Sequence, residues 1–479
     1  MARRRLALAL ALLVTVGRAD EEWSTVWAIG DLHGDAACAR YWVSRTGLIA
    51  ELDGPSSGWT WTDPTAALVF VGDYIDKGPE ARAVLEFVRA LTRRFARHVH
   101  AIMGNHELNL LADREKESGL TGAGAYRYLE LAWGAAHPGQ YASWLPPAER
   151  ESADGKAALR SLLDALADVY AARKHGDTLL AAPAPEGDGR GDRGRGGGPG
   201  EGPGEGGEAD QPRADASILR WIPDRDARAL AARELSRWQA AYLAGVASGS
   251  ELGTWLEQRP LTVVLGGTLF VHGGIAASLV AGPGAPLGSQ AALRALNAEL
   301  GARSAHGRLG ALLAERTVVH ELVEFRGLHG DCAQVAAVAA ALNVSRIAVG
   351  HTPANDVRVS CGGALLALDS ALGRWFRGSG NNYCDGETEA RSRRGGLICP
   401  RKAAGCHGQI VRLGREAKGA SGAWRVHVVP SDDHDGELAA RWAAVGAASA
   451  RADEAADAAA ATAGAGAASA SRRSRADEL

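Results

Sequence analysis

The sequence lacks an excess of positive charge, and it lacks long apolar runs outside its first twenty residues. Its 53 Lys and Arg residues stand against 56 Asp and Glu residues, which gives a net charge of -3. A general nucleic-acid-binding protein is usually basic, so this composition argues against that class of function. No internal repeat is present. We therefore expect no nucleic-acid partner and no membrane span in the mature chain.

The two ends of the chain resemble targeting signals. Arginines at residues 3–5 precede an apolar run at 6–16 and then small residues, which is the order found in a signal peptide, here residues 1–19. The last four residues, 476–479, resemble the ER-retrieval sequence Lys-Asp-Glu-Leu with Ala in the first position. Together the ends predict the secretory pathway and, within it, the ER lumen. A plastid or mitochondrial transit peptide is the alternative.

Cysteine is scarce, but its number fits an oxidising compartment. The chain has six cysteines, and three of them lie close together at Cys384, Cys399 and Cys406. Such a set suits a protein that forms disulfides outside the cytosol. Six cysteines allow many pairings, so the sequence alone assigns no bridge.

Residues 23–109 alternate apolar runs with helical patterns. Runs at 25–29, 67–71 and 99–103 predict buried strands, while residues 36–49 and 80–95 carry apolar side chains at helical spacing. Strands that alternate with helices predict an α/β sheet fold.

The rest of the chain divides into three parts. Residues 110–260 are mostly helical and predict an inserted cap, within which the Gly-rich stretch 183–215 predicts a disordered loop. The sheet pattern resumes over 261–430, where two late antiparallel strands are expected. Residues 438–479 form an Ala-rich tail.

Five short polar segments each begin where a predicted strand ends. Open α/β sheets build their sites at the carboxyl ends of strands, so these segments are expected to converge. Glycines within them allow tight turns and a close approach of the backbone to a ligand. The segments are Gly30–Gly34, Gly72–Gly78, Gly104–Glu107, His272–Gly274 and Gly350–Pro353.

The residue types in these segments suit two divalent cations. Carboxylates and an amide supply oxygen ligands, and histidines supply nitrogen ligands for Zn, Fe or Mn. Asp73 has two oxygens and can bridge both ions. Six residues form the predicted metal-ligand set: Asp31, His33, Asp73, Asn105, His272 and His351.

The five segments resemble the signature of the calcineurin-like metallophosphoesterases. The motif sequences are close to those of PPP-type protein phosphatases. The last segment, Gly-His-Thr-Pro, resembles the Shewanella-like phosphatases in particular. The resemblance implies a four-layer αββα sandwich with an inserted helical cap. The catalytic parts would be residues 23–109 and 261–430, and the cap residues 110–260.

The resemblance also implies the chemistry. Asp31, His33 and Asp73 would bind the first of two divalent metal ions (Mn, Fe or Zn), and Asp73, Asn105, His272 and His351 the second. A hydroxide that bridges the two ions would attack phosphorus in line. His106 would act as the general acid, with Asp76 orienting its ring.

Two further residues are expected to contact the substrate phosphate together with Asn105. Lys77 stands where the family usually has Arg, and a lysine offers a point charge in place of a bidentate grip. Phosphate binding should therefore be weaker or differently oriented. Arg326 is the candidate for a second phosphate clamp, and an ordinary surface arginine is its alternative.

Three functions remain open on the sequence alone. The first is a protein phosphatase acting on phospho-Ser, phospho-Thr or phospho-Tyr, that is, a phosphoric monoester hydrolase. The second is a small-molecule hydrolase of the same fold, such as a dinucleoside polyphosphate hydrolase. The third is a non-catalytic scaffold. The substrate would be a phosphorylated protein or a small phosphate ester, and the sequence names no regulatory partner.

Overall fold

The computed structural model describes most of the chain outside its two ends. The described residues are 23–115, 136–174, 218–282, 284–305, 318–354, 356–375, 406–415 and 424–431. The expected signal peptide, the Gly-rich loop 183–215, the tail 438–479, Cys384 and Cys399 lie outside these ranges.

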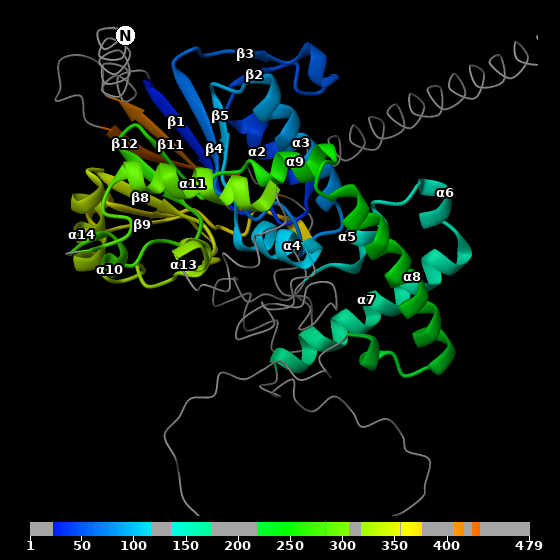
Figure 1. Ribbon diagram of the computed structural model, residues 1–479. Helices are drawn as coiled ribbons and strands as arrows, with labels where there is room; N and C mark the ends of the chain where they lie inside the picture. Colours follow the sequence, from blue (N-terminus) through cyan, green and yellow to red (C-terminus); the bar gives the residue numbers. More distant parts are fainter. Residues whose placement is uncertain are drawn as a thin grey trace, which may run out of the picture.

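The first of two mixed sheets contains the earliest strands of the chain (Figure 1). Its parallel strands are β1 (Thr25–Ile29), β4 (Ala66–Phe70) and β5 (Val99–Ala101). Two late strands extend it antiparallel, β11 (Gln409–Arg415) beside β1 and β12 (Trp424–Pro430) at the edge. The expected pair of late antiparallel strands is therefore present.

The second sheet has the order β6-β7-β8-β10-β9. Strands β7 (Thr268–Val271), β8 (Arg346–Val349) and β10 (Leu365–Ala367) run parallel at its centre. Strands β6 (Thr262–Leu265) and β9 (Arg358–Ser360) pair antiparallel at the two edges. The prediction of an α/β fold is thus confirmed in the form of two mixed sheets.

Successive side chains of a strand point to opposite faces of the sheet and belong to two different hydrophobic cores. In β4, Ala67 and Val69 join one buried cluster, while Leu68 and Phe70 join another. The first cluster also takes Phe270 from the second sheet, so it lies where the two sheets pack face to face. The central strands β1, β4, β7, β8 and β10 are buried on both faces, which explains why they appear in the sequence as unbroken apolar runs.

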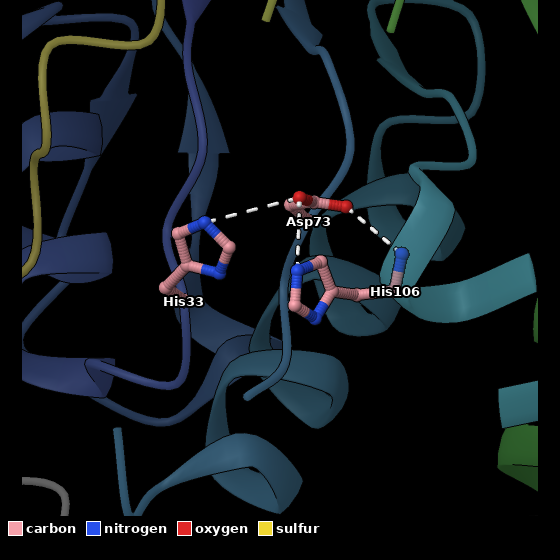
Figure 2. A group of neighbouring side chains, drawn as sticks. All are labelled: His33, Asp73 and His106. Carbon is pink, nitrogen blue, oxygen red and sulfur yellow. Dashed lines mark hydrogen bonds and ion pairs between the residues drawn. The ribbon is translucent and has the colours of Figure 1, made fainter. Parts of the chain in front are cut away.

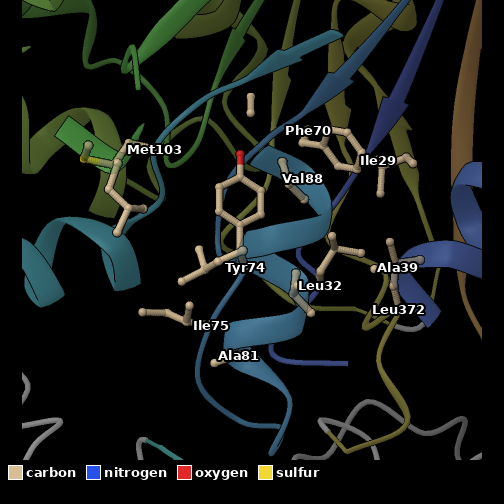
Figure 3. Close-up of a cluster of buried hydrophobic side chains, with 14 of the residues drawn as sticks. Ile29, Leu32, Ala39, Phe70, Tyr74, Ile75, Ala81, Val88, Met103 and Leu372 are labelled. Atoms are coloured by element: carbon tan, nitrogen blue, oxygen red, sulfur yellow. The ribbon is translucent and has the colours of Figure 1, made fainter. Parts of the chain in front are cut away.

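Helices cover the other face of each sheet and complete the larger core. On the first sheet these are α2 (Ala36–Arg45) and α3 (Ala81–Arg94), whose buried residues pack around Tyr74 (Figure 3). On the second sheet, α11 (Gln290–Ala305) contacts β6 and α14 (Cys332–Leu342) contacts β8. Two shorter helices, α10 (Ala277–Val280) and α13 (Val318–Glu324), lie near α14 and near α4 (Asn105–Glu115) respectively.

A helical segment follows β5 and returns to the sheets at β6. It comprises α4 (Asn105–Glu115), α5 (Pro138–Ala142), α6 (Pro147–Arg150), α7 (Ala153–Lys174), η6 (Ile218–Trp221), α8 (Arg225–Gly245) and α9 (Glu251–Glu257). Helices α6, α7 and α8 project to one side of the sheets (Figure 1). Trp238 and Tyr242 of α8 are buried, and the Tyr242 ring packs edge-on against Tyr141 of α5.

The helix expected at residues 36–49 is shorter than predicted. It ends at Arg45, because Gly47 adopts φ +66° and turns the chain. Ile49 then begins β2 (Ile49–Ala50), which pairs with β3 (Thr60–Trp61) in a two-stranded ribbon. Both strands have only two residues, too few to produce a period-2 pattern.

Two disulfides join distant parts of the chain. Cys38 of α2 is bonded to Cys406, just before β11. Cys332, at the start of α14, is bonded to Cys361, between β9 and β10. Bridges of this kind indicate an oxidising compartment. Within the described ranges, no helix combines the length and the apolar character needed to cross a membrane.

Candidate metal centre

Polar residues meet where five strands end. Gly30 follows β1, Asp73 lies just beyond β4, Asn105 follows β5, His272 follows β7 and His351 follows β8. The expected placement of the five segments at strand ends is therefore observed. The backbone is unusual there, since non-glycine residues adopt positive φ. These are His33 at 46°, Asp73 at 53°, Asp76 at 66°, Lys77 at 54° and His351 at 64°. Such conformations cluster at functional sites.

Asp73 lies at the centre of the site. Its carboxylate shares one group of potential ligand atoms with His33 and His106, and a second group with His272 and His351. Figure 2 shows His33 and His106 on either side of Asp73. Its Oδ2 lies 3.8 Å from His33 Nε2 and 3.6 Å from His106 Nε2, and its Oδ1 lies 3.2 Å from His272 Nε2. One carboxylate thus faces two ligand clusters with different oxygens.

The second cluster is completed by an amide. The Oδ1 atom of Asn105 lies 3.0 Å from His272 Nε2 and 3.1 Å from His351 Nδ1. The other nitrogen of the His272 ring, Nδ1, lies 2.7 Å from the carbonyl oxygen of Val71. This contact fixes the ring so that Nε2 faces the centre, as the outer partners of metal-bound histidines do.

In the first cluster, too, a backbone carbonyl holds one nitrogen of a histidine ring. His33 Nδ1 lies 3.1 Å from the Ile75 carbonyl, and its Nε2 lies 3.9 Å from Asp31 Oδ2. The other oxygen of Asp31, Oδ1, is buried and has no hydrogen-bond partner among the described residues. A buried carboxylate oxygen without a partner is costly unless a cation neutralises it. The donor set of carboxylate, amide and imidazole therefore fits divalent cations.

Glycines let the backbone approach these carboxylates. A Cβ atom on Gly104 would lie 2.1 Å from Asp73 Oδ1, and one on Gly350 would lie 2.3 Å from Asp31 Oδ1. Real Cβ contacts are not this short, so a larger residue would displace a ligand atom. This is the physical reason for a glycine in the third and fifth segments.

Burial and neighbouring charges shift the pKa values of the residues in the centre in different directions. Burial, together with Asp369 and Asp73, raises the pKa of Asp31 well above its usual range. Burial also acts to raise the pKa of Asp73, but the neighbouring His272 and His106 outweigh it and hold that pKa well below its usual range. Burial lowers the pKa of His33 to about 3, so this ring is neutral and able to act as a ligand.

His106 has a carboxylate partner away from the ligands. Its Nδ1 lies 2.5 Å from Asp76 Oδ2. Asp76 is itself fixed by Gln140 of α5, whose side-chain amide donates to Asp76 Oδ1 and whose Oε1 accepts from the Asp76 amide at 3.0 Å. The structure thus places Asp76 and His106 in contact, as the sequence predicted, and adds Gln140 as a support that the sequence did not reveal.

Glu107 organises the loop after β4. Its buried carboxylate accepts hydrogen bonds from the amides of Asp73 at 2.9 Å, Tyr74 at 2.8 Å and Gly104 at 3.0 Å. The bond to the Ile75 amide is longer, at 3.3 Å. One side chain therefore holds the backbone of two ligand-bearing segments together.

The two predicted phosphate contacts lie beside the centre. Lys77 is close enough to His33 and His106 for its charge to lower the pKa of each ring, behind larger effects of burial and carboxylates. Arg326 is exposed, and its Nη1 donates to the His351 carbonyl at 2.7 Å and lies 3.0 Å from Thr352 Oγ1. It is thus anchored to the backbone of the fifth segment.

Two carboxylates beside the centre, the buried Asp369 and the partly exposed Glu324, were not predicted from the sequence. Asp369, after β10, lies near Asp31 and Asp73, and burial is the main reason why its pKa rises to about 6. Glu324 places Oε2 at 3.3 Å from His351 Nε2. Asp369 could have been suspected, because it also follows a short apolar run, at residues 364–368. Glu324 ends a short helix, and no sequence signal marks it.

Comparison with known families agrees with this geometry. Residues 24–172 match the model of the calcineurin-like phosphoesterase family. This region contains the first three of the five polar segments. The resemblance stated from the sequence motifs is therefore confirmed at the level of the family.

Two relatives of this chain are named for different activities. It is 40% identical over 88 residues to a symmetrical bis(5'-nucleosyl)-tetraphosphatase of Janthinobacterium, covering 18% of this chain and 26% of that protein. It is 38% identical over 84 residues to Shewanella-like protein phosphatase 2 of Arabidopsis thaliana, covering 17% and 20%. The matched part thus spans about a quarter or less of these relatives.

A solved structure resembles this chain over a longer stretch. It is a cold-active protein-tyrosine phosphatase of a psychrophilic Shewanella. The match covers 85% of this chain and 80% of the other, with 15% identity and a TM-score of 0.42. A score of this size carries no information about substrate.

Proposed function

We propose that this protein is a two-metal phosphoesterase that removes phosphate from phosphorylated protein side chains. One observation carries the proposal: the Asp73 carboxylate faces two clusters of buried ligand atoms at once. In this proposal Asp31, His33 and Asp73 hold one cation, and Asp73, Asn105, His272 and His351 hold the other. Bound cations supply positive charge that offsets the charge of the phosphoryl oxygens.

The remaining side chains position the phosphate ester and its proton. His106 holds a proton on the ring nitrogen that faces the centre, ready for the departing oxygen of the ester. Asp76 fixes the His106 ring from behind through Nδ1. Lys77 and Arg326 bring positive charge to the edge of the site, where the phosphate oxygens would lie.

Phosphorylated protein side chains are the proposed substrate for two reasons. The motif sequences are close to those of PPP-type phosphatases, and a Shewanella-like protein phosphatase is among the relatives. A dinucleoside tetraphosphate is the second candidate, because the Janthinobacterium relative is named for that activity and has a similar identity. A scaffold without activity is the third. It is disfavoured because every expected ligand is present and buried.

The test compares two variants of the full chain loaded with Mn. In Asp73→Asn, the shared carboxylate is lost, and we expect hydrolysis of an aryl phosphate to fall at least about a hundredfold. Asp164→Asn makes the same change at an exposed position and should leave activity intact. Equal activity in both variants would contradict the proposed centre.

Substrate class is tested next with the same wild-type protein. Phosphopeptides and diadenosine tetraphosphate are compared by kcat/KM. A higher value for phosphopeptides supports a protein phosphatase, and a higher value for the dinucleotide supports the second candidate. Two tightly bound metals without hydrolysis of any of these esters would favour the scaffold.

A further inference from the structure

A cavity lies on the side of the first sheet that α3 covers, apart from the metal centre. It is lined by residues of the helices α3 and α9 and of the edge strand β5. Its volume is about 680 Å³, within the range of small-molecule sites. None of the residues that line it belongs to the proposed metal or phosphate contacts.

Positive charge dominates the lining of this cavity. Three arginines take part, Arg89 and Arg93 from α3 and Arg259 after α9, against the single carboxylate of Glu251. Glu251 lies 2.9 Å from Arg89 Nη1 and 3.6 Å from Arg93 Nη1. One carboxylate therefore faces two guanidinium groups, and His100 is the only other titratable group in the lining.

Two of the arginines have nitrogen atoms or charge left uncompensated. The Nε atom of Arg89 is buried and has no hydrogen-bond partner within the described part of the chain. Arg259 donates a hydrogen bond from Nε to the Trp255 carbonyl at 2.9 Å but forms no ion pair with any described residue, and its guanidinium lies 4.7 Å from the centre of the Trp255 ring. Burial lowers the pKa of Arg259 to about 10, so it remains charged at neutral pH. A buried donor without a partner is costly, which favours a bound acceptor.

The cavity also has apolar and aromatic surface. Trp255 is buried and fixed by a hydrogen bond from its Nε1 to Thr92 Oγ1 at 2.9 Å. Val99 and Ala96 add aliphatic surface. Guanidinium groups pair with phosphate oxygens in bidentate fashion, and the volume exceeds what an inorganic ion needs.

From this arrangement we propose that the cavity between α3, β5 and α9 binds a small organic phosphate. Arg89, Arg93 and Arg259 hold its charged group, and the surface around Trp255 covers its apolar part. The site is separate from the metal centre, so the proposal does not depend on the function assigned to that centre.

The probe is phenylphosphonate, whose carbon–phosphorus bond resists hydrolysis. Calorimetric titration of the Mn-loaded full chain should show two sites, one at the metal centre and one in the cavity. Arg89→Ala combined with Arg93→Ala should weaken the cavity site about tenfold or more, because hydrogen bonds to charged groups are lost. The constant for competitive inhibition of aryl phosphate hydrolysis reports the metal centre and should not change.

Two further variants make the test specific. Glu251→Gln removes the competing carboxylate at an exposed position and should tighten the cavity site several-fold. Arg82→Ala removes an exposed arginine of α3 outside the cavity and should leave both sites unchanged.

Three results would overturn the proposal. The first is a single site whose dissociation constant equals the inhibition constant. The second is an isotherm that is identical in wild type, the double arginine variant and Glu251→Gln. The third is phenylacetate binding to the cavity as tightly as phenylphosphonate, which would exclude selection for phosphate.

Discussion

At the scale of single residues, the site depends on side chains that hold other side chains. Asp76 fixes His106, Gln140 fixes Asp76, and Glu107 holds the loop that carries Asp73. Of these supports, only Asp76 was assigned a role from the sequence. A supporting residue touches neither metal nor substrate, so no ligand chemistry marks its position in the chain.

Replacing Glu107 should loosen the centre without removing a ligand. In Glu107→Gln, one oxygen that accepts two backbone amides becomes an NH₂ group that cannot accept. We expect the free energy of unfolding to fall by about 2–4 kcal/mol and the affinity for Mn to fall with it. Urea unfolding and metal titration would measure both effects.

Glu86→Gln is the matched control for that change, since the Glu86 side chain is 41% exposed and pairs only with Arg82 among the described residues. It should change stability by less than about 0.5 kcal/mol. If Glu107→Gln lowers the free energy of unfolding by no more than Glu86→Gln does, Glu107 does not organise the loop.

Replacing Lys77 by arginine should strengthen phosphate binding. Lys77→Arg replaces a point charge by a guanidinium that can grip two phosphate oxygens. The inhibition constant for inorganic phosphate should fall about threefold or more. Lys156→Arg, on the exposed side of α7, should have no effect. An unchanged constant in Lys77→Arg would mean that residue 77 does not contact the phosphate.

At the scale of elements, the strands and the positions of the five segments could be predicted. Each central strand is buried on both faces, so an unbroken apolar run marks it, and polar residues mark its end. The two-residue strands β2 and β3 could not be predicted, because no periodicity exists over two residues. The short helix α5, which carries Gln140, also has no strong signal.

The N-cap residue of helix α5 is expected to make the stability of the protein depend on pH. His137 is its N-cap, and its Nδ1 accepts a hydrogen bond from the Gly139 amide at 3.0 Å. Burial lowers the pKa of His137 to about 4, so the folded protein keeps this ring neutral. The unfolded chain binds a proton near pH 6.5, so stability should fall as the pH drops from about 6.5 towards 4.

The variant His137→Asn isolates this effect, because asparagine also caps helices but does not titrate. Between pH 7 and pH 5 the wild type should lose about 2 kcal/mol more stability than the variant. Urea unfolding at both pH values gives the difference. Equal losses would show that His137 is not held neutral in the folded state.

At the scale of the whole molecule, the disulfides were beyond prediction, because the sequence gives the number of cysteines and not their distances. Cys38 and Cys406 are separated by 368 residues, and Cys332 and Cys361 by 29. A bridge across a longer loop removes more entropy from the unfolded chain.

Replacing each pair by alanine should therefore have unequal effects. Loss of the Cys38–Cys406 bridge should lower stability by about 2 kcal/mol more than loss of the Cys332–Cys361 bridge. Denaturant unfolding of the two double variants would measure this difference. A larger loss for the shorter loop would show that local packing outweighs loop entropy.

The long bridge also bears on how the protein is made. Cys38 emerges early from the ribosome, while its partner Cys406 follows after nearly all of the described sheets. The proposed ligands are similarly spread, from Asp31 to His351. The bridge cannot form before Cys406 is made, and the proposed ligand set is incomplete before His351 is made. An interrupted synthesis would leave Cys38 unpaired and the centre without its last histidine, a state that a quality-control system can distinguish from the finished protein.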